Sequence, residues 1–238
     1  MRKAACISFL LIAFAPFIFA ADPVAKKLTI VFENKLGYDM IEPGKIVTTI
    51  LGEKISIEKF KYYVSNFSVT GQDGKRIALP VQYFLVDAAN PGSQTISFSI
   101  PDIAIKQISF LLGVDSIKNV SGIQTGALDP LNGMFWTWNS GYIMAKLEGT
   151  AEGLASAGHR FTHDIGGYKS GENAARMIEL NLPVGISNEI HITADLNKWF
   201  RGKSEIRITD APVCHTPGSL AMRIADNYAT MFSVKTSN

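Results

Sequence analysis

Two tryptophans and two histidines stand near each other in the middle of the chain, and their side chains could bind a metal. Trp136 and Trp138 lie between glycines and polar amides, and His159 and His163 follow about twenty residues later. Large aromatic side chains between glycines and polar amides are unlike ordinary core packing. Imidazoles in a shielded aromatic pocket suit a soft, weakly hydrated ion such as Cu(I). The pattern therefore predicts a copper site formed by Trp136, Trp138, His159 and His163.

The same residues also permit a purely structural interpretation. His159 and His163 are four positions apart and share a face in a helix or a strand, but they lack the His-Glu-x-x-His pattern of zinc proteases. One imidazole could hydrogen-bond locally while the other is solvated. The two tryptophans could be large anchors that close one end of the fold. Met134 could add a thioether ligand or simply fill space.

The other two histidines have different neighbours. His191 lies in an alternating segment, on the polar face with Glu189 and Thr193. His215 directly follows Cys214, and a thiol beside an imidazole can bind copper or zinc, although adjacent side chains often diverge. For Cys214 alone, a buried inert thiol is the expected role.

The N-terminal residues have the pattern of a secretory signal peptide. Met1-Arg2-Lys3 is basic, an apolar run follows, and small residues offer cleavage near Ala20. We expect a signal peptide over residues 1–20, one domain over residues 21–238, no membrane span, and a periplasmic or secreted product. Cleavage removes two basic residues from a chain of formal net charge +2, which leaves about zero. A near-neutral domain lacks the basic footprint of nucleic-acid binding.

Apolar and polar residues alternate along most of the chain, which predicts short strands. Turn signals between them favour an all-β (mainly) fold, an antiparallel β-sandwich. Two short helices are expected to cover it, one capped by Asp195 and one by Ser219. Residues 113–132 read as a long loop with a functional role. The strands are expected over residues 28–33, 61–69, 81–86, 94–100, 107–112, 142–148, 176–180, 189–193 and 205–209.

Motifs of catalysis are missing from the sequence. It contains no Gly-x-Ser-x-Gly, no phosphate loop and no dinucleotide fingerprint, and the spacing of its carboxylates indicates no acid/base pair. We therefore expect a binding protein rather than an enzyme.

A series of motifs in fixed order resembles the MbnP-like family, named for the periplasmic partner protein of the methanobactin copper-chelator operon. The most specific is the Trp-x-Trp block of Gly133–Trp138, and the resemblance extends over nearly the whole mature chain. The motifs are Lys61–Phe67, Tyr83–Asp87, Phe110–Asp115, Gly126–Pro130, Gly133–Trp138, Lys146–Gly149, His163–Gly167 and Ala225–Phe232.

The resemblance implies a β-rich periplasmic or surface protein that binds copper. In some relatives a tryptophan is oxidised to kynurenine by a partner di-haem protein related to cytochrome c peroxidases, and the product joins histidines in the copper site. For this chain the resemblance implies Trp136 or Trp138, together with His163. Two other functions stay open: a non-metal binding module that uses exposed tryptophans, and a structural or electron-transfer accessory protein.

Overall fold

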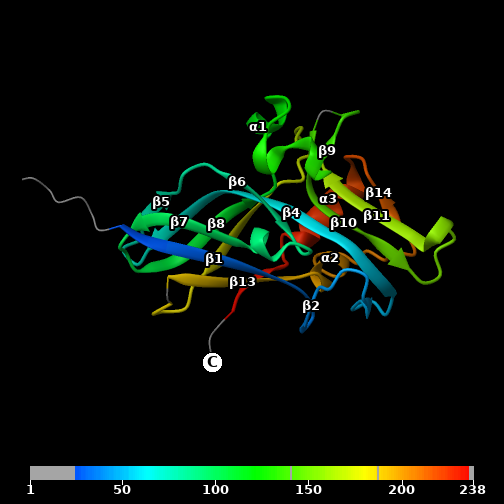
Figure 1. Ribbon diagram of the computed structural model, residues 1–238, viewed down its shortest axis with the longest axis horizontal. Helices are drawn as coiled ribbons and strands as arrows, with labels where there is room; N and C mark the ends of the chain where they lie inside the picture. Colours follow the sequence, from blue (N-terminus) through cyan, green and yellow to red (C-terminus); the bar gives the residue numbers. More distant parts are fainter. Residues whose placement is uncertain (1–24, 140, 187, 236–238) are drawn as a thin grey trace, which may run out of the picture.

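Two β-sheets form the body of the protein, and their facing sides enclose the core (Figure 1). The structure is a computed structural model that describes residues 25–139, 141–186 and 188–235; the expected signal peptide lies outside these residues. The smaller sheet has the order β15-β13-β1-β2, with β7 also paired to β1. Its strands are β1 (Ala25–Leu36), β2 (Asp39–Met40), β7 (Thr95–Pro101), β13 (Glu189–Asp195) and β15 (Phe232–Val234).

The larger sheet has the order β12-β8-β4-β10-β11-β14; of four further short strands, β3, β5 and β6 pair with β4, and β9 pairs with β10. The long strand β4 (Lys54–Gly71) pairs with both β8 and β10 and so connects the two halves of this sheet. The other strands are β3 (Ile46–Thr48), β5 (Arg76–Ala78), β6 (Tyr83–Asp87), β8 (Ile105–Leu112), β9 (Phe135–Trp136), β10 (Gly141–Ala151), β11 (Arg160–Gly166), β12 (Arg176–Asn181) and β14 (Val213–Cys214).

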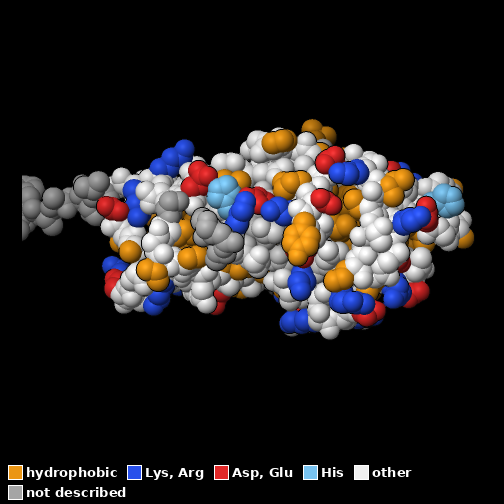
Figure 2. Space-filling model, turned by 90° about the horizontal axis from the view of Figure 1, so that it is seen from below, with side chains coloured by type: hydrophobic (Ala, Val, Ile, Leu, Met, Phe, Trp, Pro, Cys, Tyr) orange, Lys and Arg blue, Asp and Glu red, His pale blue; other side chains and the backbone are white. Residues whose placement is uncertain are grey.

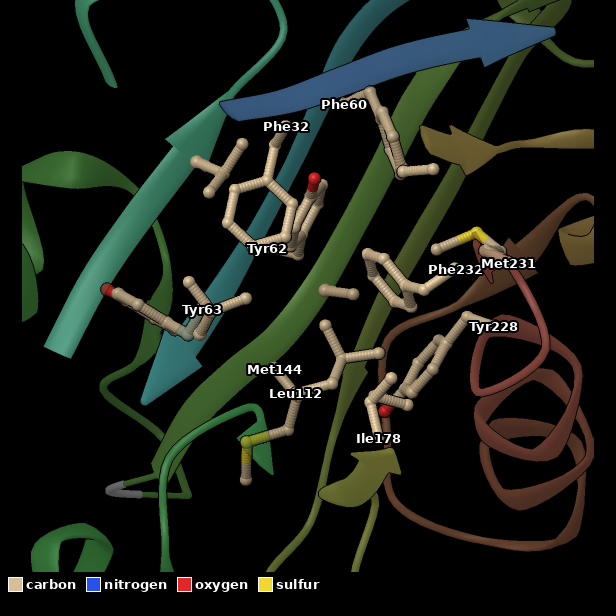
Figure 3. Close-up of a cluster of buried hydrophobic side chains, with 14 of the residues drawn as sticks. Phe32, Phe60, Tyr62, Tyr63, Leu112, Met144, Ile178, Tyr228, Met231 and Phe232 are labelled. Carbon is tan, nitrogen blue, oxygen red and sulfur yellow. The ribbon is translucent and has the colours of Figure 1, made fainter. Parts of the chain in front are cut away.

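Interlocking aromatic side chains fill the space between the sheets (Figure 3). Phe32 of β1 contacts the rings of Tyr62, Phe110 and Phe232 edge-on, at centroid distances of 6.0, 5.7 and 6.3 Å. Such edge-to-face pairs add to the free energy gained from burial. The alternation seen in the sequence therefore corresponds to one face of each sheet turned inward.

Helices cover one end of the sheets. They are α2 (Asn197–Phe200) and α3 (Ser219–Tyr228), which pack against each other, while α1 (Ser116–Val120) stands out at the top of Figure 1, near β9. At α2 the cap position is Leu196, one residue later than expected, although Asp195 does accept a hydrogen bond from the Asn197 N–H at 3.0 Å. At α3 the cap position is Gly218, without a side-chain hydrogen bond, so Ser219 begins the helix instead of capping it. None of the helices in the described part of the chain is long and apolar enough to span a membrane.

The expected mainly β, sandwich-like fold is confirmed, with differences in detail. The pairs β1–β13 and β11–β14 are parallel, so the sheets are mixed rather than antiparallel throughout. The prediction of a strand over residues 205–209 was wrong. The N–H groups of Ile208 and Thr209 donate to the Glu53 carboxylate and not to a neighbouring strand. Short 3₁₀ turns also occur, at Pro91–Gln94 (η1), Gly126–Leu128 (η2), Pro130–Asn132 (η3) and Ala157–His159 (η4).

Candidate functional site

The two tryptophans of the Trp-x-Trp block lie against each other. Their ring centroids are 5.3 Å apart with planes tilted by 36°. Trp136 is 5% exposed and belongs to β9, which pairs with the first residues of β10. Trp138 is 61% exposed. One indole is thus fixed in the fold, and the other lies open on its surface.

Glycine at the end of β11 makes room for the buried indole. A methyl group on Gly166 would lie 2.7 Å from Trp136 Cζ3 and 2.8 Å from the Tyr142 carbonyl oxygen. Because side chains alternate along a strand, Gly166 shares its face of β11 with Asp164 and not with His163. Trp136 therefore lies on the outer face of this strand.

His163 points the other way, into the core. It is fully buried, and Trp199 Nε1–H donates a hydrogen bond to its Nδ1 at 3.1 Å. Its Nε2 is therefore the protonated nitrogen, which donates to the Ala211 carbonyl oxygen at 2.7 Å. Burial lowers the pKa of His163. Both ring nitrogens are engaged, so a role as metal ligand would require one of these hydrogen bonds to break.

His159 lies at the other end of the same strand. It occupies the turn before β11, exposed, with a left-handed φ of 53° and Nδ1–H donating to the Leu154 carbonyl oxygen at 2.6 Å. β11 ends beside β9 in Figure 1, and its seven residues span about 20 Å at the usual rise per residue. The structure therefore brings Trp136 and Trp138 together, but it separates both from His159 and turns His163 away.

A hollow opens beside Trp138. Its volume is about 190 Å³, and it is lined by Trp138, Asn139, Gly167, Tyr168, Lys169, Glu172, Thr216 and Pro217. The last two of these residues directly follow His215, whose side chain is exposed and lines an adjoining hollow. The sequence offered one signal for His215, its place next to Cys214, and the two side chains do diverge: Cys214 is buried, which raises its thiol pKa to about 11.

A row of alternating charges runs across the outer face beneath this region. Lys146 Nζ lies 2.8 Å from Asp164 Oδ1 and 2.7 Å from Glu148 Oε1, and Lys59 binds the other oxygen of Glu148 at 2.8 Å. Burial raises the pKa of Asp164, although Lys146 and His215 act in the opposite direction. β11 and β14 run parallel with His163 opposite Cys214, so Asp164 and His215 are the next residues along the two neighbouring segments.

No three His, Cys, Asp or Glu side chains converge as a ready metal site within the described residues. The remaining histidine, His191, hydrogen-bonds to Glu33 and Glu189 on the smaller sheet, far from the tryptophans in the chain and in the fold.

The fold and this surface define a class: a β-sandwich-like domain with a tilted tryptophan pair, one ring buried and one exposed, beside the start of β10. The MbnP family model matches residues 25–216, so the chain belongs to the MbnP family. Its fold is similar to that of MbnP from Methylosinus trichosporium, with a TM-score of 0.54, 13% identity, and coverage of 76% of this chain and 80% of that one. Among curated proteins, none matches the chain.

Proposed function

We propose that this chain is a copper-binding protein of the periplasm or cell exterior whose site lies at the Trp136–Trp138 pair. The observation that carries the proposal is the exposure of Trp138, which lies on Trp136 beside a hollow and next to the segment of His215. Membership of the MbnP family supports it. Export is supported by the signal-peptide pattern of residues 1–20.

The donors near Trp138 fit copper only after a chemical change. Indole offers an N–H donor and no free lone pair in its plane, so an unmodified tryptophan is a poor ligand. Kynurenine instead presents an aromatic amine and a carbonyl. With that product at position 138, an amine nitrogen and the His215 imidazole would lie at the same surface, a nitrogen-rich set that suits copper.

Trp138 is the better candidate for oxidation, because Trp136 is enclosed. Opening the indole breaks its C2–C3 bond and adds two oxygen atoms, a four-electron oxidation that reduces two molecules of hydrogen peroxide to water. Hydrolysis then releases C2 as formate and leaves kynurenine, a net gain of one oxygen and loss of one carbon. The chain itself is the substrate of this step, and the oxidant is a di-haem protein activated by peroxide.

Asp164 has a supporting role in this proposal. Ligand histidines commonly hold a carboxylate on their second nitrogen, which fixes the ring and raises its basicity. Asp164 follows His163 just as His215 follows its pairing partner Cys214 in the neighbouring strand, and the Asp164 carboxylate is held by Lys146 at 2.8 Å.

A Cu(I) competition titration tests the proposal, with intact mass recorded on each sample. We expect tight binding of one equivalent of Cu(I) only in protein that has gained one oxygen and lost one carbon. Trp138→Phe should show neither the mass change nor the tight binding. His215→Ala should keep the mass change but weaken binding at least tenfold, equivalent to about 1.4 kcal/mol. The matched control is His191→Ala, which should bind normally. Tight binding by unmodified protein, or by oxidised His215→Ala, would contradict the assignment.

The exposed ring also favours a second candidate function. An indole above a hollow lined by polar side chains is a stacking platform for a flat or sugar-like ligand. In that case ligands would quench the fluorescence of Trp138 with a copper chelator in excess. If instead the quenching of Trp138 fluorescence disappears when copper is chelated, the result supports copper binding.

A further inference from the structure

Strand β6 lies at an edge of the larger sheet, beside β4 (Figure 1). Its register places Val86 opposite Tyr62, and the Ala88 N–H extends the pairing by donating to the Phe60 carbonyl oxygen at 3.0 Å. Along its other side β4 pairs with β10 and β8. The second edge of β6 is therefore a margin of the sheet, because β4 is its sole strand partner in the described part of the chain.

The hydrogen bonds of Asp87 show which backbone groups of β6 face this margin. Its N–H donates to Ser93 Oγ at 2.9 Å, and its carbonyl oxygen lies 3.2 Å from the same hydroxyl. Asp87 thus turns its backbone groups away from β4. Because the residues of an antiparallel pair face the partner strand alternately, Leu85 and Tyr83 also turn their N–H and C=O groups outward.

These outward groups of Leu85 and Tyr83 have no hydrogen-bond partner within residues 25–139, 141–186 and 188–235. Unpaired edge groups are a template for a further strand, and proteins usually protect them with proline or charged side chains. The stretch Tyr83–Val86 contains neither. Two N–H donors and two carbonyl acceptors are therefore available to a chain that lies along β6.

Two adjoining hollows follow the same margin. The first, of about 370 Å³, lies at the start of β6, where Gln82 and Lys118 line it. The second, of about 350 Å³, continues to Asp87. Tyr83 and Ala127 line both hollows, which makes them one groove along β6. The five residues of the strand give this groove a length of about 17 Å at the usual rise per residue.

The groove has a wall on each face of the sheet. Residues 126–132 form the outer wall, where Ala127 accepts a hydrogen bond at 3.1 Å from Tyr63, which faces the side of β4 opposite to Tyr62. Residues 90–96 form the inner wall and continue into β7 of the smaller sheet. A single extended chain fits between such walls. In a second copy of this protein β6 is recessed in the same way, so two β6 margins could not approach closely enough to pair.

Charge indicates the direction and composition of the chain that fits. Lys61 and Asp87, at the far end of β6, neutralise each other at 3.0 Å. Lys118, at the start of β6, lies over the Tyr83 ring at 5.9 Å, and its ammonium has no acidic partner in the described residues. On the face shown in Figure 2, by contrast, acidic and basic side chains intermix. A chain antiparallel to β6 would bring its carboxyl end to Lys118, where a negative charge is favourable.

We infer that β6 and its groove bind an extended peptide segment, which adds antiparallel to β6 as a further strand and carries a carboxylate at the Lys118 end. Main-chain hydrogen bonds to Tyr83 and Leu85 supply the affinity in this mode of recognition, and the hollows select side chains. The site is separate from the copper proposal, because the groove and the hollow beside Trp138 share no lining residue in the described chain.

Amide hydrogen exchange, followed by NMR, tests the pairing directly. The probe is a library of random heptapeptides with free carboxyl ends, from which enriched peptides are resynthesised. We expect exchange at Tyr83 and Leu85 to slow about tenfold or more when such a peptide binds. The Val86 amide, which faces β4, is the internal control and should be protected in both states. Unchanged exchange at Leu85, or a library without an enriched peptide, would overturn the inference.

Variants of the peptide and of the protein test the same hydrogen bonds from both sides. N-methylation of alternate peptide amides should raise Kd about tenfold in one alternating set and leave it unchanged in the other, since only one set faces β6. Leu85→Pro removes an N–H from the margin, where proline is tolerated, and should abolish binding. Leu85→Val keeps the N–H and should bind as the wild type does. The N-methylated peptides decide the matter if the proline variant fails to fold.

The charge at the start of the groove has its own test. Lys118→Gln should weaken binding of the enriched peptides about threefold, the usual size of an exposed ion pair. The matched control is Lys203→Gln, at an exposed position outside the groove, which should have no effect. Equal binding by Leu85→Pro, or equal sensitivity to N-methylation in both peptide sets, would contradict pairing along β6. Protection of Leu85 that rises with protein concentration in the absence of peptide would assign the margin to a second copy instead.

Discussion

The protein contains two tryptophan–histidine neighbourhoods on opposite faces of β11, and they differ in every respect that matters for chemistry. Inside, Trp199 and His163 have nearly parallel ring planes, 10° apart, and share a hydrogen bond. Outside, Trp138 is exposed, and so is His215, whose two following residues line the hollow beside Trp138. Both ring nitrogens of the inner imidazole and the inner indole N–H are hydrogen-bonded, whereas the outer pair faces solvent.

This difference shows how burial assigns roles to identical residue types. The core cannot tolerate an unpaired polar group, so the inner imidazole and indole are matched to each other and to the Ala211 carbonyl. At the surface, water satisfies both groups, which can later exchange water for a ligand. Residue type therefore suggested chemistry at both places, and only the fold separates them.

The largest expected effect comes from breaking the inner pair. His163→Ala would leave Trp199 Nε1–H without an acceptor and open a cavity beneath it. We expect a loss of about 3 kcal/mol in the free energy of unfolding, from the combined cost of an unsatisfied group and a cavity. Urea titration measures it. His215→Ala, at an exposed position, should change stability by less than about 0.5 kcal/mol. Equal losses in both variants would remove the distinction between the two neighbourhoods.

A second change links the outer pair to the strand beneath it. Gly166→Ala places a methyl group 2.7 Å from Trp136, so the indole must move and the contact with Trp138 must change. Overpacking of this kind costs about 1–3 kcal/mol. Thermal unfolding and the tryptophan emission spectrum would both report it.

An exposed glycine provides the control for this substitution. The added methyl group of Gly92→Ala would meet only Asn90 Oδ1, at 3.4 Å. This variant should leave the emission spectrum unchanged. A wild-type spectrum in Gly166→Ala would show that Trp136 does not depend on the space above that glycine.

Much of the fold followed from alternation along the chain. In β1 the expected inward residues Leu28, Ile30 and Phe32 are buried, and the same alternation continues beyond the expected residues 28–33 to Leu36. The direction of neighbouring strands could not be predicted in this way, because apolar and polar residues alternate equally in parallel and antiparallel pairs. α1 also escaped prediction, since its five residues are too few to show a helical period.

The candidate site was predicted in part. The tryptophan pair was found by its unusual neighbours in sequence. His163 was predicted as a ligand from its spacing to His159 and from the family resemblance. The strand β11 was not predicted, because a histidine fills one of its buried positions between Phe161 and Ile165. His215 reaches the site through a loop that returns from a distant part of the chain. A spacing rule between histidines does not detect such a contact.

The smallest effect separates the two neighbourhoods by pH. Burial holds the pKa of His163 below its ordinary value of 6.5, so this residue stays neutral in the folded protein while it becomes protonated in the unfolded chain. The contribution of neutral His163 to the free energy of unfolding is complete above pH 6.5. It is lost as the pH falls from there toward the pKa of His163 in the folded protein. Between pH 7.5 and 5.5 we therefore expect the free energy of unfolding of the wild type to decrease. His163→Gln, unable to titrate, should lack this component, whereas His215→Gln should keep it. A pH profile of His163→Gln parallel to that of the wild type would show that the inner imidazole accepts a proton without cost, and the contrast between the sealed and the open histidine would fail.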